Sequence, residues 1–101
     1  MRISASGFNP RHRRFEPSTP TSAEMEADDG IPVKAVIRDI SASGVALNMA
    51  TPYDNGTFVQ VHIEGFGRMS GNVIRSYEGG VAVVFENRQD EKKVSKFNGL
   101  A

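Results

Sequence analysis

A chain of 101 residues is long enough for one domain and leaves little room for a second. Its 12 basic and 12 acidic residues balance, which argues against the broadly basic surface of a protein that binds nucleic-acid polymers. The absence of cysteine excludes disulfides and agrees with a cytoplasmic location, and no apolar run approaches the roughly 20 residues that span a bilayer, so no membrane association is expected.

The N-terminal segment, residues 1–20, is predicted to be a flexible arm. It contains glycine, several prolines and hydroxyl residues, with few sizeable apolar side chains. Such a composition buries too little surface to offset the entropy of ordering the chain. The arm also carries a basic cluster that suits a small anion better than a polymer. The cluster consists of Arg11, Arg13 and Arg14.

From residue 21 onward, polar and apolar residues alternate in short runs, which is typical of half-buried strands. Six strands are expected, over residues 21–27, 31–39, 45–49, 57–64, 68–77 and 81–86. Turn signals separate several of them, including Asn55-Gly56 and Glu78-Gly79-Gly80. In the fifth strand, Arg75 falls in the same register as Val73.

This pattern predicts an all-β fold: a six-stranded antiparallel β-barrel with a short C-terminal helix, over residues 21–98. A sandwich is the alternative. Closure into a barrel is favoured because the exposed edges of a small sheet would pair with other chains. Residues 99–101 are expected to form a tail.

The expected helix follows the last strand. Val94, Phe97 and Leu100 fall at helical spacing, and acidic residues precede lysines in the order that complements the helix dipole. Asn87 is the expected N-cap. We expect Phe97 to pack against one end of the barrel.

Catalytic and metal chemistry find little support in the sequence. His12 and His62 lie on separate predicted elements, and a zinc site needs three or four convergent ligands. No Gly-Lys-Ser/Thr phosphate loop follows a strand, and no pair of carboxylates stands out as an acid–base couple. We therefore expect no metal, no cofactor and no enzymatic activity.

A compact polar segment, Asp39-Ile40-Ser41-Ala42-Ser43-Gly44, separates the second and third predicted strands. Two interpretations are open. Asp39 and Ser41 can bond nearby backbone amides, with Gly44 at positive φ, as in an ordinary turn. Alternatively, the same carboxylate and hydroxyl are offered to a ligand, and the glycine lets it approach the backbone.

The Asp39–Gly44 segment and the arginine cluster fit one ligand chemistry when they are taken together. Guanine has an N–H edge that a carboxylate accepts and a π face on which a guanidinium stacks. Phosphate oxygens accept hydrogen bonds from arginine forks and backbone amides. The ligand class indicated is therefore a guanine nucleotide.

The chain resembles the PilZ domains, a family that binds the bacterial second messenger cyclic di-GMP. The Asp39–Gly44 segment satisfies the family's Asp/Asn-x-Ser-x-x-Gly motif, and residues 56–63, 71–75 and 80–85 follow its strand pattern. The resemblance covers roughly residues 11–98. It implies a monomeric barrel that binds cyclic di-GMP and signals to a protein partner.

The arginines depart from the family's pattern, because its Arg-x-x-x-Arg motif is absent from the arm. Counting from Arg11 the partner position is Phe15, and counting back from Arg14 it is Pro10. Arg14 and Arg11 are the first candidates for ligand contact. The full set of predicted ligand-binding residues is Arg11, Arg13, Arg14, Asp39, Ser41, Gly44 and Arg75, the last because the family often has a large residue there.

Three functions follow from these observations. The first is a cyclic di-GMP receptor whose arginine arm orders over the ligand. The second, which the altered arginine spacing motivates, is a PilZ-like protein-interaction module that does not bind the nucleotide. A barrel that binds single-stranded nucleic acid ranks third, because six Phe, two Tyr and no Trp offer few stacking platforms.

Overall fold

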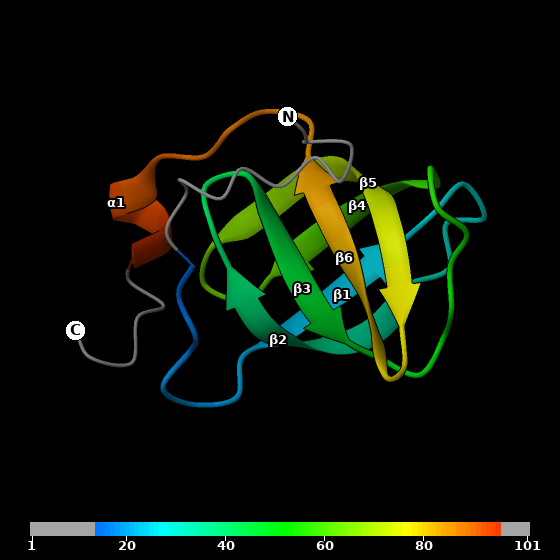
Figure 1. Cartoon of the computed structure of the whole chain (residues 1–101), viewed down its shortest axis with the longest axis horizontal. Coiled ribbons are helices and arrows are strands. Elements are labelled where there is room, and N and C mark those ends of the chain that lie inside the picture. Colours follow the sequence, from blue (N-terminus) through cyan, green and yellow to red (C-terminus); the bar gives the residue numbers. More distant parts are fainter. Residues whose placement is uncertain (1–13, 96–101) are drawn as a thin grey trace.

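The computed structural model describes residues 14–95, which form a closed barrel of six antiparallel strands followed by one short helix (Figure 1). The elements are β1 (Ser22–Glu26), β2 (Val33–Ile40), β3 (Gly44–Asn48), β4 (Phe58–Ile63), β5 (Gly67–Tyr77), β6 (Gly80–Phe85) and α1 (Glu91–Val94). Their order around the barrel is β1-β2-β3-β6-β5-β4, and β4 pairs with β1 to close it. The predicted fold class is confirmed, with strand ends within two residues of the expected ones.

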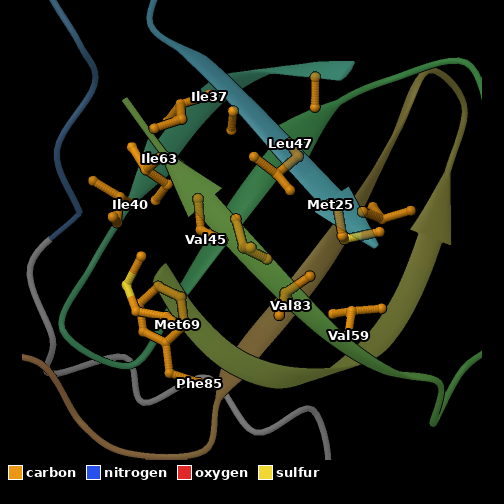
Figure 2. Packing of buried hydrophobic residues seen from close by; sticks show 14 of the residues in the cluster. Met25, Ile37, Ile40, Val45, Leu47, Val59, Ile63, Met69, Val83 and Phe85 are labelled. Carbon is orange, nitrogen blue, oxygen red and sulfur yellow. The ribbon is translucent and has the colours of Figure 1, made fainter. Parts of the chain in front are cut away.

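The alternation of side chains along each strand fills the barrel with apolar groups (Figure 2). In β4, Val59, Val61 and Ile63 are fully buried, while the intervening His62 is exposed as expected. Each strand contributes in the same way, and Met25, Leu47 and other core side chains have no exposed surface. Within the described residues, the barrel interior is therefore occupied by apolar side chains, as in other close-packed proteins.

Local chemistry explains where the strands begin and end. Glu78 and Gly79 form a two-residue turn between β5 and β6, and Gly79 has a φ of 87°, which glycine adopts without strain. The second strand begins at Val33 rather than at Ile31, because Pro32 has no N–H for the ladder. Ile31 is accordingly 62% exposed.

The C-terminal helix differs from the sequence prediction at its start. Its N-cap is Asp90, whose carboxylate accepts a hydrogen bond of 2.9 Å from the Lys92 N–H, so the prediction of Asn87 was wrong. Val94 is fully buried, and the helix lies at one end of the barrel (Figure 1). Phe97, the residue predicted to pack there, lies outside the described residues.

Phe15 belongs to the core although it lies in the segment predicted as a flexible arm. Its side chain is 3% exposed. It forms a β-bridge with Ile40: the Phe15 N–H donates to the Ile40 carbonyl at 2.7 Å, and the Ile40 N–H donates back at 2.9 Å. The end of the arm is therefore attached where β2 enters the Asp39–Gly44 segment.

Candidate functional site

The Asp39–Gly44 segment is a tight connection between β2 and β3. The Ser41 N–H donates to the Gly44 carbonyl at 2.8 Å, which closes the turn. The Ser41 hydroxyl accepts from the Ser43 N–H at 3.2 Å and lies 3.1 Å from the Ser43 hydroxyl. Ser41 is fully buried and shapes the turn, as the first interpretation of this segment predicts. Gly44 does not have positive φ; it is the first residue of β3.

Two backbone hydrogen bonds from β6 and from the connection to α1 also hold this turn in place. The Phe85 N–H at the end of β6 donates to the Ser43 carbonyl at 2.9 Å. The Gln89 N–H, in the connection to α1, donates to the Ala42 carbonyl at 2.8 Å. Because both carbonyls and the Ser41 hydroxyl are engaged by the protein, the segment is a rigid support for the residues on either side of it.

A β-bulge next to the turn changes which way two side chains face. Ile37 lies opposite Leu47 and Asp39 lies opposite Ala46, so Arg38 is an extra residue in β2. Successive side chains of a regular strand alternate between faces, but a bulge interrupts that alternation. Arg38 and Asp39 consequently both face outward, between the buried Ile37 and Ile40.

The Asp39 carboxylate lies between two guanidinium groups. The Arg14 Nε donates to Asp39 Oδ1 at 2.6 Å, and the Arg14 Nη2 contacts the same oxygen. On the other side, the Arg38 Nε lies 4.0 Å from Oδ2. The bridge between Phe15 and Ile40 places Arg14 for this contact. The structure thus brings together Arg14 and Asp39, two residues predicted for the site.

Tyr77 forms the opposite border of this surface. Its ring centroid is 5.3 Å from the Arg38 Cζ and 5.9 Å from the Arg75 Cζ, distances at which a guanidinium is attracted to an aromatic ring. Its hydroxyl donates to the Leu47 carbonyl at 3.3 Å, across β6. The Tyr77 hydroxyl is also the main cause that raises the pKa of Arg38, followed by the charges of Asp39 and Glu16.

Arg75 reaches the outer surface through a second bulge. Val73 lies opposite Val83 and Arg75 opposite Ala82, so Ile74 is the extra residue in β5. Arg75 therefore leaves the register of the buried Val73, in which the sequence pattern placed it, and is exposed.

Two alanines lie between Asp39 on one side of this surface and Arg75 on the other. Asp39 is opposite Ala46, Ala46 is opposite Ala82, and Ala82 is opposite Arg75, so one row crosses four strands. Strands lie about 4.8 Å apart, which separates the outer members of the row by about 14 Å along the surface. By strand alternation both alanines face outward, opposite to the inward-facing valines and leucine of β3 and β6. They are largely covered, with 7% and 2% of their surface exposed, and are called the alanine floor below.

Not every predicted site residue enters this arrangement. Arg11 and Arg13 lie outside the described residues. Ser41 and Gly44 are buried in the turn, while Arg14, Asp39 and Arg75 lie on the outer surface. Sequence reasoning missed Arg38 and Tyr77. Arg38 could have been found from its position next to Asp39 in the sequence. Tyr77 could not, because no local sequence pattern pairs Arg38 with a tyrosine on another strand.

Other features of the described residues do not point to a second site. Residues 14–95 contain no group of three His, Cys, Asp or Glu side chains that could hold a metal, and no helix among them could cross a membrane. An open hollow of about 440 Å³ lies over β1 and β2, away from the Asp39 carboxylate. It is lined by Ser22, Ala23, Glu24, Lys34, Ala35, Val36 and Asn48.

Comparisons with solved structures show which proteins share this fold. The PilZ domain of CeSA from a cellulose-synthesizing bacterium has a TM-score of 0.65 and 23% identity, with 87% of this chain and 97% of that one covered. The PilZ domain of YcgR from Escherichia coli, with c-di-GMP, has a TM-score of 0.61 and 12% identity, with coverage of 92% and 88%. The MrkH–c-di-GMP complex from K. pneumonia has a TM-score of 0.61 and 18% identity, with coverage of 88% and 49%.

These structural likenesses show the shared fold. No curated protein sequence was found to match the chain. The family model of the PilZ domain matches residues 9–98, which includes every described strand and the helix. The chain belongs to the PilZ domain family.

Proposed function

We propose that this protein is a receptor domain for cyclic di-GMP and has no enzymatic activity. The structurally similar PilZ domain of YcgR and the protein MrkH were both solved with c-di-GMP, which supports this ligand. The observation that carries the proposal is the pairing of Arg14 with Asp39 on the outer surface, beside the rigid turn. A guanidinium and a carboxylate from distant parts of the chain meet there above the alanine floor.

The chemistry of these groups matches a guanine dinucleotide. The Asp39 carboxylate accepts hydrogen bonds from the N–H edge of guanine. Arg14 binds phosphate oxygens with its planar fork or stacks on a base. Arg75, on the other side of the alanine floor, is proposed to contact a second phosphate or base. Ser41 and Gly44 hold the turn, and Arg11 and Arg13 close over the ligand from the arm.

The signal is proposed to be the ordering of the N-terminal arm. The bridge between Phe15 and Ile40 attaches the base of the arm at the site, so ligand contacts by Arg11 and Arg13 would fix the preceding residues as well. The ordered arm then presents a different surface to a protein partner.

Isothermal titration calorimetry with the purified full chain tests the proposal. Arg14→Ala and Asp39→Ala each remove a charge-assisted contact worth on the order of 2 kcal/mol, so each should weaken binding about thirtyfold. Arg68→Ala is the matched control, since Arg68 is an exposed arginine whose partner is Gln60, on β4. No heat from the wild-type protein at about 0.5 mM cyclic di-GMP overturns the proposal.

A protein-interaction module that does not bind the nucleotide is the second candidate. The missing Arg-x-x-x-Arg spacing favours it, because only Arg14 of the arm lies near Asp39 within the described residues. Under this alternative, a partner would bind equally well with and without cyclic di-GMP, and the calorimetric titration would show no heat.

A further inference from the structure

Asp39 has an arginine on each side, and only one of them comes from the arm. Arg14 contacts Oδ1, while Arg38, on the barrel itself, lies 4.0 Å from Oδ2. The side chain of Arg38 is 56% exposed, so its donors are accessible to a ligand on the outer surface. The bulge in β2 is the reason that it shares a face with Asp39.

Arg38 is also held in place. The Arg38 Cζ lies 5.3 Å from the centroid of the Tyr77 ring. Tyr77 is itself fixed by the hydrogen bond that its hydroxyl donates to the Leu47 carbonyl. Gly80 leaves the space that the ring occupies, since a Cβ there would lie 2.7 Å from the Tyr77 Cζ and hydroxyl. Long arginine side chains lose entropy when a ligand orders them, and a support of this kind reduces that loss.

We propose that Arg38, held between Tyr77 and Asp39, binds a phosphate of the dinucleotide as the second arginine of the site, beside Arg14. The guanidinium lies beside the tyrosine ring, and 56% of the Arg38 side chain is exposed, which leaves N–H donors for phosphate oxygens. Arg14 and Arg38 then supply two ligand arginines without the Arg-x-x-x-Arg spacing, and the contacts of Arg11 and Arg13 add to them. This inference rests on the proposed function.

Tyr77 acts through Arg38 as a positioning residue. Tyr77→Ala removes the support, so it should weaken binding as Arg38→Ala does, even though the tyrosine itself does not contact the ligand. Tyr77→Phe keeps the ring and should bind nearly as well as the wild type. A tyrosine that served only to stabilise the barrel would not separate these two variants in ligand affinity while both stay folded.

The test is calorimetry with cyclic di-GMP on the full chain and its variants, with circular dichroism to verify folding. Arg38→Ala should weaken binding at least about tenfold, the loss of one charge-assisted hydrogen bond, and Arg38→Lys should fall between it and the wild type. Lys34→Ala is the matched control, because Lys34 is also an exposed cation of β2 but lies outside this surface. It should bind within about twofold of the wild type.

The outcomes separate this inference from the proposed function. If the wild type binds and folded Arg38→Ala binds within twofold of it, Arg38 is not a ligand residue and the inference is overturned, while the proposed function stands. If the wild type gives no heat, both are overturned. Equal weakening of cyclic di-GMP binding by Lys34→Ala and Arg38→Ala would also contradict the inference, since that result indicates general charge attraction.

Discussion

Asp39 and Ser41 belong to the same short motif but differ in what they contact. Asp39 faces outward and contacts arginines from two parts of the chain. Ser41 is fully buried and bonds the backbone of its own turn. The motif therefore combines an outward-facing carboxylate, the proposed ligand contact, with a buried hydroxyl that supports the turn.

Gly80 is a residue whose replacement tests the packing beneath the site. A Cβ at this position would overlap the Leu47 carbonyl oxygen and approach the Tyr77 ring at 2.7 Å. Gly80→Ala should lower the free energy of unfolding by about 1–3 kcal/mol, the usual cost of overpacking. Urea unfolding measures it.

Glu78→Ala is the control for that measurement, because Glu78 is exposed in the same turn. It should change stability by less than about 0.5 kcal/mol. A Gly80→Ala variant as stable as Glu78→Ala would show that the barrel accommodates a methyl group there and would contradict the close packing of Tyr77.

At the scale of elements, two bulges decide the composition of the outer surface. The one in β2 places Arg38 beside Asp39, and the one in β5 brings Arg75 out of the register of Val73. Bulges occur often next to binding sites because they redirect a side chain without breaking the sheet. The strands between them, β3 and β6, contribute the alanine floor.

Phe15, where the arm joins the barrel, makes a contribution to stability that can be measured. Phe15 is buried and bridges Ile40, so Phe15→Ala should lower the free energy of unfolding by about 3–5 kcal/mol, as for other buried aromatic residues. The neighbouring exposed Glu16→Ala should have almost no effect. Chemical denaturation compares the two, and equal stabilities would mean that the bridge does not anchor the arm.

At the scale of the whole molecule, the filled interior and the closed sheet restrict where binding can occur. All six strands pair on both sides, so β-strand addition at an edge is not available to a partner of this barrel. The core leaves no room for a nucleotide. Both observations agree with the proposal that the ligand binds on the outer surface over β2, β3, β6 and β5.

Binding there should stabilise the entire domain, because a small barrel unfolds cooperatively. At a free cyclic di-GMP concentration of about one hundred times Kd, linkage adds about 2.7 kcal/mol. For a domain of this size that corresponds to a rise in Tm of about 10–20 °C. Differential scanning fluorimetry measures the shift.

Asp39→Ala is the control for the thermal shift. With binding weakened about thirtyfold, the same ligand concentration is only about three times its Kd, so linkage adds about 0.9 kcal/mol and Tm should rise by about 3–7 °C, roughly a third of the wild-type shift. A wild-type Tm that does not move at saturating ligand would contradict specific binding to the folded state.

The sequence by itself determined the number of strands, their approximate bounds and the turns between them. These features depend on local physical chemistry: alternation sets the buried face of a strand, and Asn55-Gly56 or Glu78-Gly79 sets a turn. The Asp39–Gly44 motif could likewise be identified from the sequence. Asn87 was a wrong choice of N-cap because several nearby residues can cap a helix, and Asp90 is the one whose carboxylate accepts from the Lys92 N–H.

Only the tertiary structure decided which side chains share the outer surface. The contacts of Arg38 with Tyr77 and of Arg14 with Asp39 depend on the register between strands and on two bulges, which no local pattern specifies. A shift of one residue would turn each of these side chains to the opposite face. The chain's own residues thus encode the barrel locally, while the arrangement of its arginines arises from how the strands are paired.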